Sequence, residues 1–202
     1  MTIFVIDINT NYGHYSTSYI KQLCDFNNIN FYVLKNNIPQ NVFNRHPSWL
    51  KCFCHDIVDD DFIILWDADL VPNKLYNLKQ FFNTGMLNMC VDYGLFTNPN
   101  YRFNEKFKYN CGLIGVPKTY NTFLKDIYFN SAATYPSFEQ YYINDKIHDE
   151  HITVNELPLN LNHAYIENNE HVLNTHYTYS GKINNIMSHN ITTHSSDIKG
   201  TI

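Results

Sequence analysis

The fold is decided by the stretch FIILWDAD, residues 62–69. Its first five residues are apolar, a run that is too short for a core helix and is typical of a fully buried strand. Asp67 and Asp69 follow at the point where this strand ends. In open α/β sheets, ligands bind in the crevice beyond the carboxyl ends of the strands. Both carboxylates are therefore expected to face a binding site.

The segments that precede this stretch indicate a parallel sheet. The run TIFVIDI at 2–8 and the run NFYVL at 30–34 predict two strands. Between them, Ser16 and Ser18 are expected to cap a helix that continues through Cys24. A strand, a helix and a second strand in this order favour parallel pairing, with the first loop at the carboxyl edge of the sheet.

The segments around and after residues 62–69 extend this α/β pattern. The segment Leu70-Val71-Pro72 is expected to end the strand pairing after Asp69. The remaining elements predicted from apolar spacing are helices at 47–58, 73–82, 118–129 and 137–147 and strands at 89–95 and 111–116. We predict one α/β domain over residues 1–182, with a mixed, mainly parallel central sheet flanked by helices, and a polar tail over 183–202.

Composition excludes several classes of protein. The chain of 202 residues has a formal net charge of −5, which does not fit binding to a nucleic-acid backbone or an anionic membrane. No basic leader precedes the first strand, and no apolar run approaches the roughly 18 to 20 residues of a membrane span. The five cysteines are scattered and are read as reduced thiols. We expect a soluble, cytoplasmic protein without a transmembrane segment.

Asp67 and Asp69 are candidate ligands for a metal ion. Two carboxylates placed this close repel each other unless a cation lies between them. Oxygen ligands suit Mg²⁺ or Mn²⁺, which keep open positions for the phosphates of a nucleotide. The pattern Asp-x-Asp is common, however, and the alternative is that the pair caps the next helix.

Four segments in order carry a resemblance to a known family. They are NTNY at 9–12, DAD at 67–69, NCG at 110–112 and HYTYSGK at 176–182. Together they resemble the GT-A glycosyltransferases, in particular glycosyltransferase family 8, whose members transfer sugars from sugar nucleotides with retention. The resemblance implies a GT-A, Rossmann-like fold and a Mn²⁺ or Mg²⁺ cofactor. It also implies a nucleoside diphosphate sugar as donor, with UDP favoured.

The resemblance also implies roles for individual residues. Those expected to bind the donor are Asn9, Asn11, Tyr12, Lys51, Asp67 and Lys182. Those expected to ligate the metal are Asp67, Asp69 and His176, with His163 as a competing ligand. Those expected on the acceptor side are Asn110, Gly112 and Tyr141. Tyrosine faces also stack well on sugars, and aromatic residues make up 16% of the chain.

One motif departs from the family. The family's Asp-Gln-Asp segment is similar to Glu139-Gln140-Tyr141 here, so the second carboxylate is replaced by tyrosine. Gln140 and Glu139 are the implied catalytic side chains, which would brace the sugar face opposite the leaving group. With retention, the leaving phosphate takes the proton of the acceptor. With inversion, a carboxylate base would be required, and Asp145, Asp149 and Glu150 are the nearest candidates in the sequence.

The sequence thus predicts a metal-dependent glycosyltransferase that moves a sugar to a glycan or another hydroxyl acceptor. Two alternatives remain open. Residues 63–71 also resemble the first motif of haloacid-dehalogenase-type phosphatases, in which Asp67 would be the nucleophile. The other alternative is a non-catalytic domain that keeps the fold and binds nucleotides or glycans.

Overall fold

The computed structural model describes residues 1–8, 10, 13–35, 45–92, 105–131, 138–164 and 172–177. Four residues with expected roles, Asn9, Asn11, Tyr12 and Lys182, lie outside this part of the chain, as does the segment 183–202. The strands are β1 (Thr2–Ile6), β2 (Asn30–Leu34), β3 (Phe62–Asp67), β4 (Leu70–Pro72), β5 (Leu87–Val91), β6 (Tyr109–Pro117), β7 (Val154–Leu157), β8 (His163–Ala164) and β9 (Asn174–His176). The α-helices are α1 (Gly13–Asn27), α2 (Cys54–Ile57), α4 (Asn121–Asn130) and α5 (Gln140–Asp149). The 3₁₀ helices are η2 (Pro47–Phe53), η3 (Lys79–Phe81), η4 (Glu105–Phe107), η5 (Lys118–Tyr120) and η6 (Leu159–Leu161).

The central sheet is mixed, as predicted. Its six strands have the order β2-β1-β3-β6-β5-β7. Strand β1 pairs in parallel with both β2 and β3, and β5 pairs in parallel with β7. Strand β6 runs antiparallel to both of its neighbours, β3 and β5. The predicted strand–helix–strand opening therefore forms the parallel half of the sheet, and β6 joins that half to β5 and β7.

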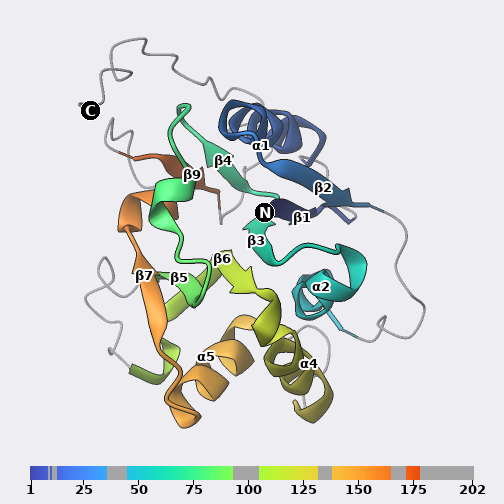
Figure 1. Ribbon diagram of the computed structural model, residues 1–202, viewed down its shortest axis with the longest axis vertical. Coiled ribbons are helices and arrows are strands. Elements are labelled where there is room, and N and C mark those ends of the chain that lie inside the picture. Colours follow the sequence, from blue (N-terminus) through green and yellow to red (C-terminus); the bar gives the residue numbers. More distant parts are fainter. Residues whose placement is uncertain are drawn as a thin grey trace.

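Helices cover both faces of this sheet because β3 is apolar on both faces. Ile64 and Trp66 point into a core shared with α1. Ile63 and Leu65 point into a second core, which includes residues of α4 and α5. Figure 1 shows α1 beside β4, on the opposite side of the view from α4 and α5. A continuous apolar run is typical of a strand that is buried on both sides.

A second, three-stranded sheet, with the order β4-β9-β8, was not predicted. The prediction that residues 70–72 end the strand pairing is wrong, because Leu70–Pro72 forms β4 and pairs antiparallel with β9. The helix predicted at 73–82 is also wrong, and only η3 forms there. The side chain of Asn27 binds this segment instead, donating to the carbonyl of Tyr76 at 2.9 Å and accepting from the amide of Leu78 at 2.8 Å.

Helix α1 begins earlier than predicted. Its first residue is Gly13, whose amide donates to the hydroxyl of Thr10 at 3.1 Å. The expected caps Ser16 and Ser18 lie inside the helix and donate to the carbonyls of Gly13 and Tyr15. The caps were misplaced because a serine hydroxyl can bond either an exposed amide or a carbonyl of the preceding turn.

The other predicted elements are found with shifted boundaries. The helix expected at 47–58 forms as η2 followed by α2, and the helices expected at 118–129 and 137–147 form as η5 with α4 and as α5. Within the described residues, no helix has the length and the apolar character needed to cross a lipid bilayer.

Candidate functional site

Asp67 and Asp69 lie at the carboxyl edge of the parallel strands. Asp67 is the last residue of β3 and stands opposite Ile6 of β1, so the chain that follows β1 starts beside it. The turn between β3 and β4 is closed by Trp66, whose indole N–H donates to the carbonyl of Leu70 at 2.7 Å. Since Trp66 is also a core residue, this turn is fixed to the interior. Carboxylate oxygens of Asp67 and Asp69 lie within 4.8 Å of each other.

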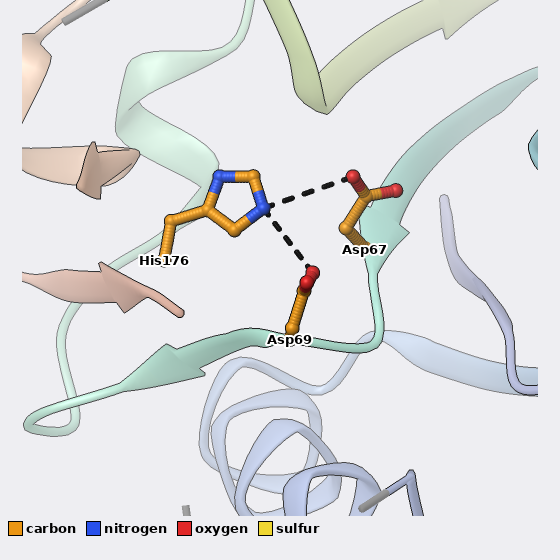
Figure 2. A group of neighbouring side chains, drawn as sticks. All are labelled: Asp67, Asp69 and His176. Atoms are coloured by element: carbon orange, nitrogen blue, oxygen red, sulfur yellow. Dashed lines mark hydrogen bonds and ion pairs between the residues drawn. The ribbon is translucent and has the colours of Figure 1, made fainter. Parts of the chain in front are cut away.

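His176 is brought to these carboxylates by the second sheet. It is the last residue of β9 and stands opposite Leu70 of β4. The amide of Tyr177 donates to the carbonyl of Asp69 at 2.9 Å. In Figure 2 the imidazole points between the two aspartates, with Nε2 at 3.2 Å from Oδ1 of Asp69 and 3.8 Å from Oδ2 of Asp67.

These three side chains can hold one cation. Each offers a ligand atom, and the three atoms lie within 4.8 Å of one another. Two carboxylates and one imidazole are donors that Mn²⁺ and Mg²⁺ accept, with open positions left for phosphate oxygens. The competing candidate His163 lies on β8 opposite Thr175, and among the described residues it is not part of this group.

The electrostatics of the group fit a cation. Desolvation and the nearby Asp69 raise the pKa of Asp67, and Lys51 opposes this rise. Desolvation would lower the pKa of His176, but the carboxylates of Asp69 and Asp67 outweigh it and raise that pKa above 6.5. A divalent cation would favour ionised carboxylates and a neutral imidazole, and it would therefore replace the proton that the group otherwise attracts.

Lys51, which was predicted to bind the donor, is buried next to the metal group. Only 3% of the residue is exposed. Its ammonium lies 2.7 Å from Oδ1 of Asp67 and 2.8 Å from Oε1 of Glu139, and it donates to the carbonyl of Cys111 at 2.7 Å. Desolvation opposes the charge, but the two carboxylates outweigh it and raise the pKa of Lys51 above 10.5.

Glu139, one of the two implied catalytic side chains, is 3% exposed. Desolvation would raise its pKa, but the Lys51 ammonium outweighs it and holds that pKa below 4.5. A carboxylate with a lowered folded-state pKa stabilises the fold fully above the unfolded value of 4.5, and this contribution is lost as the pH falls through the folded pKa.

Replacing Glu139 with glutamine is therefore expected to destabilise the protein at neutral pH. Breaking a buried ion pair lowers the free energy of unfolding by about 3–5 kcal/mol. We expect a loss at the lower end of this range, because Lys51 still pairs with Asp67 in the variant. In urea denaturation the difference from wild type is expected to shrink as the pH falls below 4.5. Glu150→Gln is the matched control, since it removes an exposed pair with Lys146 that is worth at most about 1 kcal/mol. Equal free energies of unfolding for both variants would contradict the expectation.

Gln140, the other implied catalytic side chain, has both ends of its amide bound. Its Oε1 accepts from the amide of Cys111 at 2.9 Å, and its Nε2 donates to Oδ2 of Asp92 at 3.1 Å. Asp92 directly follows β5, is half-buried, and was missed by the sequence analysis. It lies inside the strand predicted at 89–95, so only the observed end of β5 at Val91 places it at the edge of the sheet.

The segment Asn110–Gly112 supports the site through its backbone. Strand β6 has a bulge opposite β5. Met89 pairs with Ile114, whereas the next residue of β5, Cys90, pairs with Asn110. Cys111 lies in this bulge, where its amide and carbonyl bind Gln140 and Lys51. Bulges are frequent next to active sites because they redirect side chains and free backbone groups.

The other residues expected on the acceptor side lie near the same bulge. The side-chain oxygen of Asn110 accepts from the amide of Gly112 at 2.8 Å and from the side chain of Asn162 at 2.7 Å. Tyr141 is 57% exposed, and its ring packs edge to face against Phe107 with the ring centroids 5.3 Å apart. Their contact with an acceptor stays a prediction.

Solved structures share this fold. One is a glycosyltransferase involved in glycosylation of the major capsid of PBCV-1, with 16% identity over 92% of this chain and 96% of that one and a TM-score of 0.67. Another is the galactosyltransferase LgtC in complex with donor and acceptor sugar analogs, with 12% identity over 89% and 88% and a TM-score of 0.54. A third is a Drosophila β-1,4-galactosyltransferase 7 variant with manganese, UDP-Gal and xylobiose, with 15% identity over 87% and 70% and a TM-score of 0.51.

The chain therefore has the GT-A glycosyltransferase fold. No protein-family model matches its sequence, and no curated protein is similar to it in sequence. At 12–16% identity the likeness to the solved structures establishes the fold and leaves the activity to be argued from the site.

Proposed function

We propose that the protein is a metal-dependent glycosyltransferase, related to family 8, that uses a nucleoside diphosphate sugar, with UDP favoured. The observation that carries the proposal is the group Asp67, Asp69 and His176 at the carboxyl edge of a GT-A sheet. This edge is where open α/β sheets bind their ligands. The catalytic domain proposed is residues 1–182.

Two of the similar structures support this assignment of the donor. LgtC was solved with donor and acceptor sugar analogs, and the Drosophila enzyme with manganese and UDP-Gal. The carboxylates and imidazole of the present chain are donors suited to the same kind of cation. A divalent cation bound there would neutralise the charge of the leaving diphosphate.

The proposed donor site combines residues that the structure describes with others that lie outside the described ranges. Asp67, Asp69 and His176 would hold the cation. Lys182 would bind the diphosphate through its ammonium. The base would lie against the loop after β1, on Asn9, Asn11 and Tyr12. Because Ile6 stands opposite Asp67, a nucleotide that spans from this loop to the cation is consistent with the register of β1 and β3.

We propose transfer with retention to a hydroxyl of a glycan or another acceptor. Glu139 and Gln140 would lie on the sugar face opposite the leaving group, while the leaving phosphate takes the acceptor proton. The acceptor would contact Asn110, Gly112 and Tyr141. NMR of the first product tests this step, since a product with the inverted anomeric configuration would overturn retention and favour a carboxylate base.

The whole proposal is tested with a panel of nucleotide sugars. We expect slow hydrolysis of one UDP-sugar that requires Mn²⁺ and stops when EDTA is added. Tight Mn²⁺-dependent binding of nucleotide without hydrolysis of any donor would favour the non-catalytic alternative. Hydrolysis of a generic phosphate ester that is lost in Asp67→Asn would favour the phosphatase alternative.

A further inference from the structure

The ammonium of Lys51 is fully used by protein acceptors. An ammonium has three N–H donors. Here the three acceptors are Oδ1 of Asp67, Oε1 of Glu139 and the carbonyl of Cys111, all at 2.7–2.8 Å. With 4% of its side chain exposed, Lys51 would have to break one of these bonds to contact a donor sugar or phosphate.

Lys51 also determines which oxygen of Asp67 faces the metal group. Oδ1 of Asp67 is paired with the ammonium, and Oδ2 is directed towards His176 at 3.8 Å. The second carboxylate on Lys51 belongs to Glu139, which immediately precedes Gln140 at the start of α5. The buried ammonium of Lys51 therefore links the metal group to the two implied catalytic side chains.

The backbone of Cys111 completes this arrangement. Its carbonyl accepts from Lys51 and its amide donates to Gln140, so the β6 bulge binds both partners in fixed positions. A buried ammonium held by three oxygens from three separate elements has little freedom to move. The geometry is that of a positioning group whose partners do the chemistry.

We propose that Lys51 is a positioning residue, which orients Asp67 for the cation and Glu139 for the sugar and acts through them without contacting the donor. This inference rests on the proposed function. A positive group beside a metal site repels the metal ion, so the charge of Lys51 is expected to lower the affinity for Mn²⁺. Removal of Lys51 is expected to tighten Mn²⁺ binding while it slows turnover.

The test compares the double variant Lys51→Met, Glu139→Gln with the single variant Glu139→Gln, so that only Lys51 differs between them. The single variant Lys51→Met leaves two carboxylates without their cation and can fail to fold, whereas the double variant removes one positive and one negative charge together. Lys118→Met is the matched control, because its ammonium pairs at the surface with Asp59. Calorimetry at about pH 8, where carboxylates are ionised, measures binding of Mn²⁺ alone and then of UDP in the presence of Mn²⁺.

We expect the dissociation constant for Mn²⁺ to be about fivefold lower in the double variant than in Glu139→Gln. Relative to Glu139→Gln, we expect UDP affinity to stay within about threefold and kcat for donor hydrolysis to fall about tenfold or more. A loss of UDP affinity of about tenfold or more would identify Lys51 as a donor ligand and overturn the inference. Weaker Mn²⁺ binding would also overturn it, since it would indicate a merely structural role. Wild-type protein that binds no Mn²⁺ would instead overturn the proposed function itself and this inference with it.

Discussion

Replacing Asp69 with asparagine is expected to lower kcat/KM for donor hydrolysis by about 1,000-fold or more. Asparagine keeps the shape of the side chain but removes the charge that would bind the cation. The carboxylate lies 3.2 Å from Nε2 of His176, and only 14% of the side chain is exposed. The fold should persist, because the contact with Tyr177 uses the backbone carbonyl of Asp69.

Steady-state kinetics across a Mn²⁺ titration measures this effect. The control is Asp59→Asn, since Asp59 is 94% exposed and pairs only with a surface lysine among the ion pairs of the described residues. Its kcat/KM should remain within about twofold of wild type, as expected for a surface pair. The metal site would be misassigned if Asp69→Asn kept more than about a tenth of wild-type activity.

Replacing Gly112 with alanine is expected to weaken Mn²⁺ binding by about 10- to 100-fold. A Cβ at this position would lie 2.5 Å from Cε1 of His176 and 2.9 Å from its Nδ1. It would also lie 2.9 Å from Oδ1 of Asn110. Carbon atoms do not approach this closely, so the imidazole has to leave the position in which its Nε2 faces Asp67 and Asp69. The glycine is needed here because it leaves room for the metal-binding ring.

Calorimetry with Mn²⁺ tests this prediction, and thermal denaturation checks that the variant is folded. Gly85→Ala is the matched control, because its Cβ would meet only Oδ1 of Asn83 at an ordinary 3.5 Å. We expect Gly85→Ala to bind Mn²⁺ like wild type. Unchanged Mn²⁺ affinity in a folded Gly112→Ala variant would show that His176 is not a ligand.

The sequence alone determined the parallel half of the sheet and the position of two carboxylates. Both follow from local patterns. The apolar run of β3 can be buried only as a strand covered on two faces, and the residues that end such a strand must lie at the edge of the sheet. Asp67 and Asp69 were therefore found without knowledge of any distant contact.

Only the tertiary structure decided which side chains join them. His176 lies 107 residues after Asp69 and reaches it because β9 pairs with β4, a strand that local propensity had excluded. The same pairing places residues 70–72 in a second sheet, where the prediction had ended the strand pairing, and the pairing of β8 with β9 sets His163 opposite Thr175. Lys51, which was expected to bind the donor, is buried, and its ammonium binds three oxygens from distant parts of the chain. Hydrophobic spacing describes how one segment is buried, whereas pairing between short strands and burial of a charge depend on partners far along the chain.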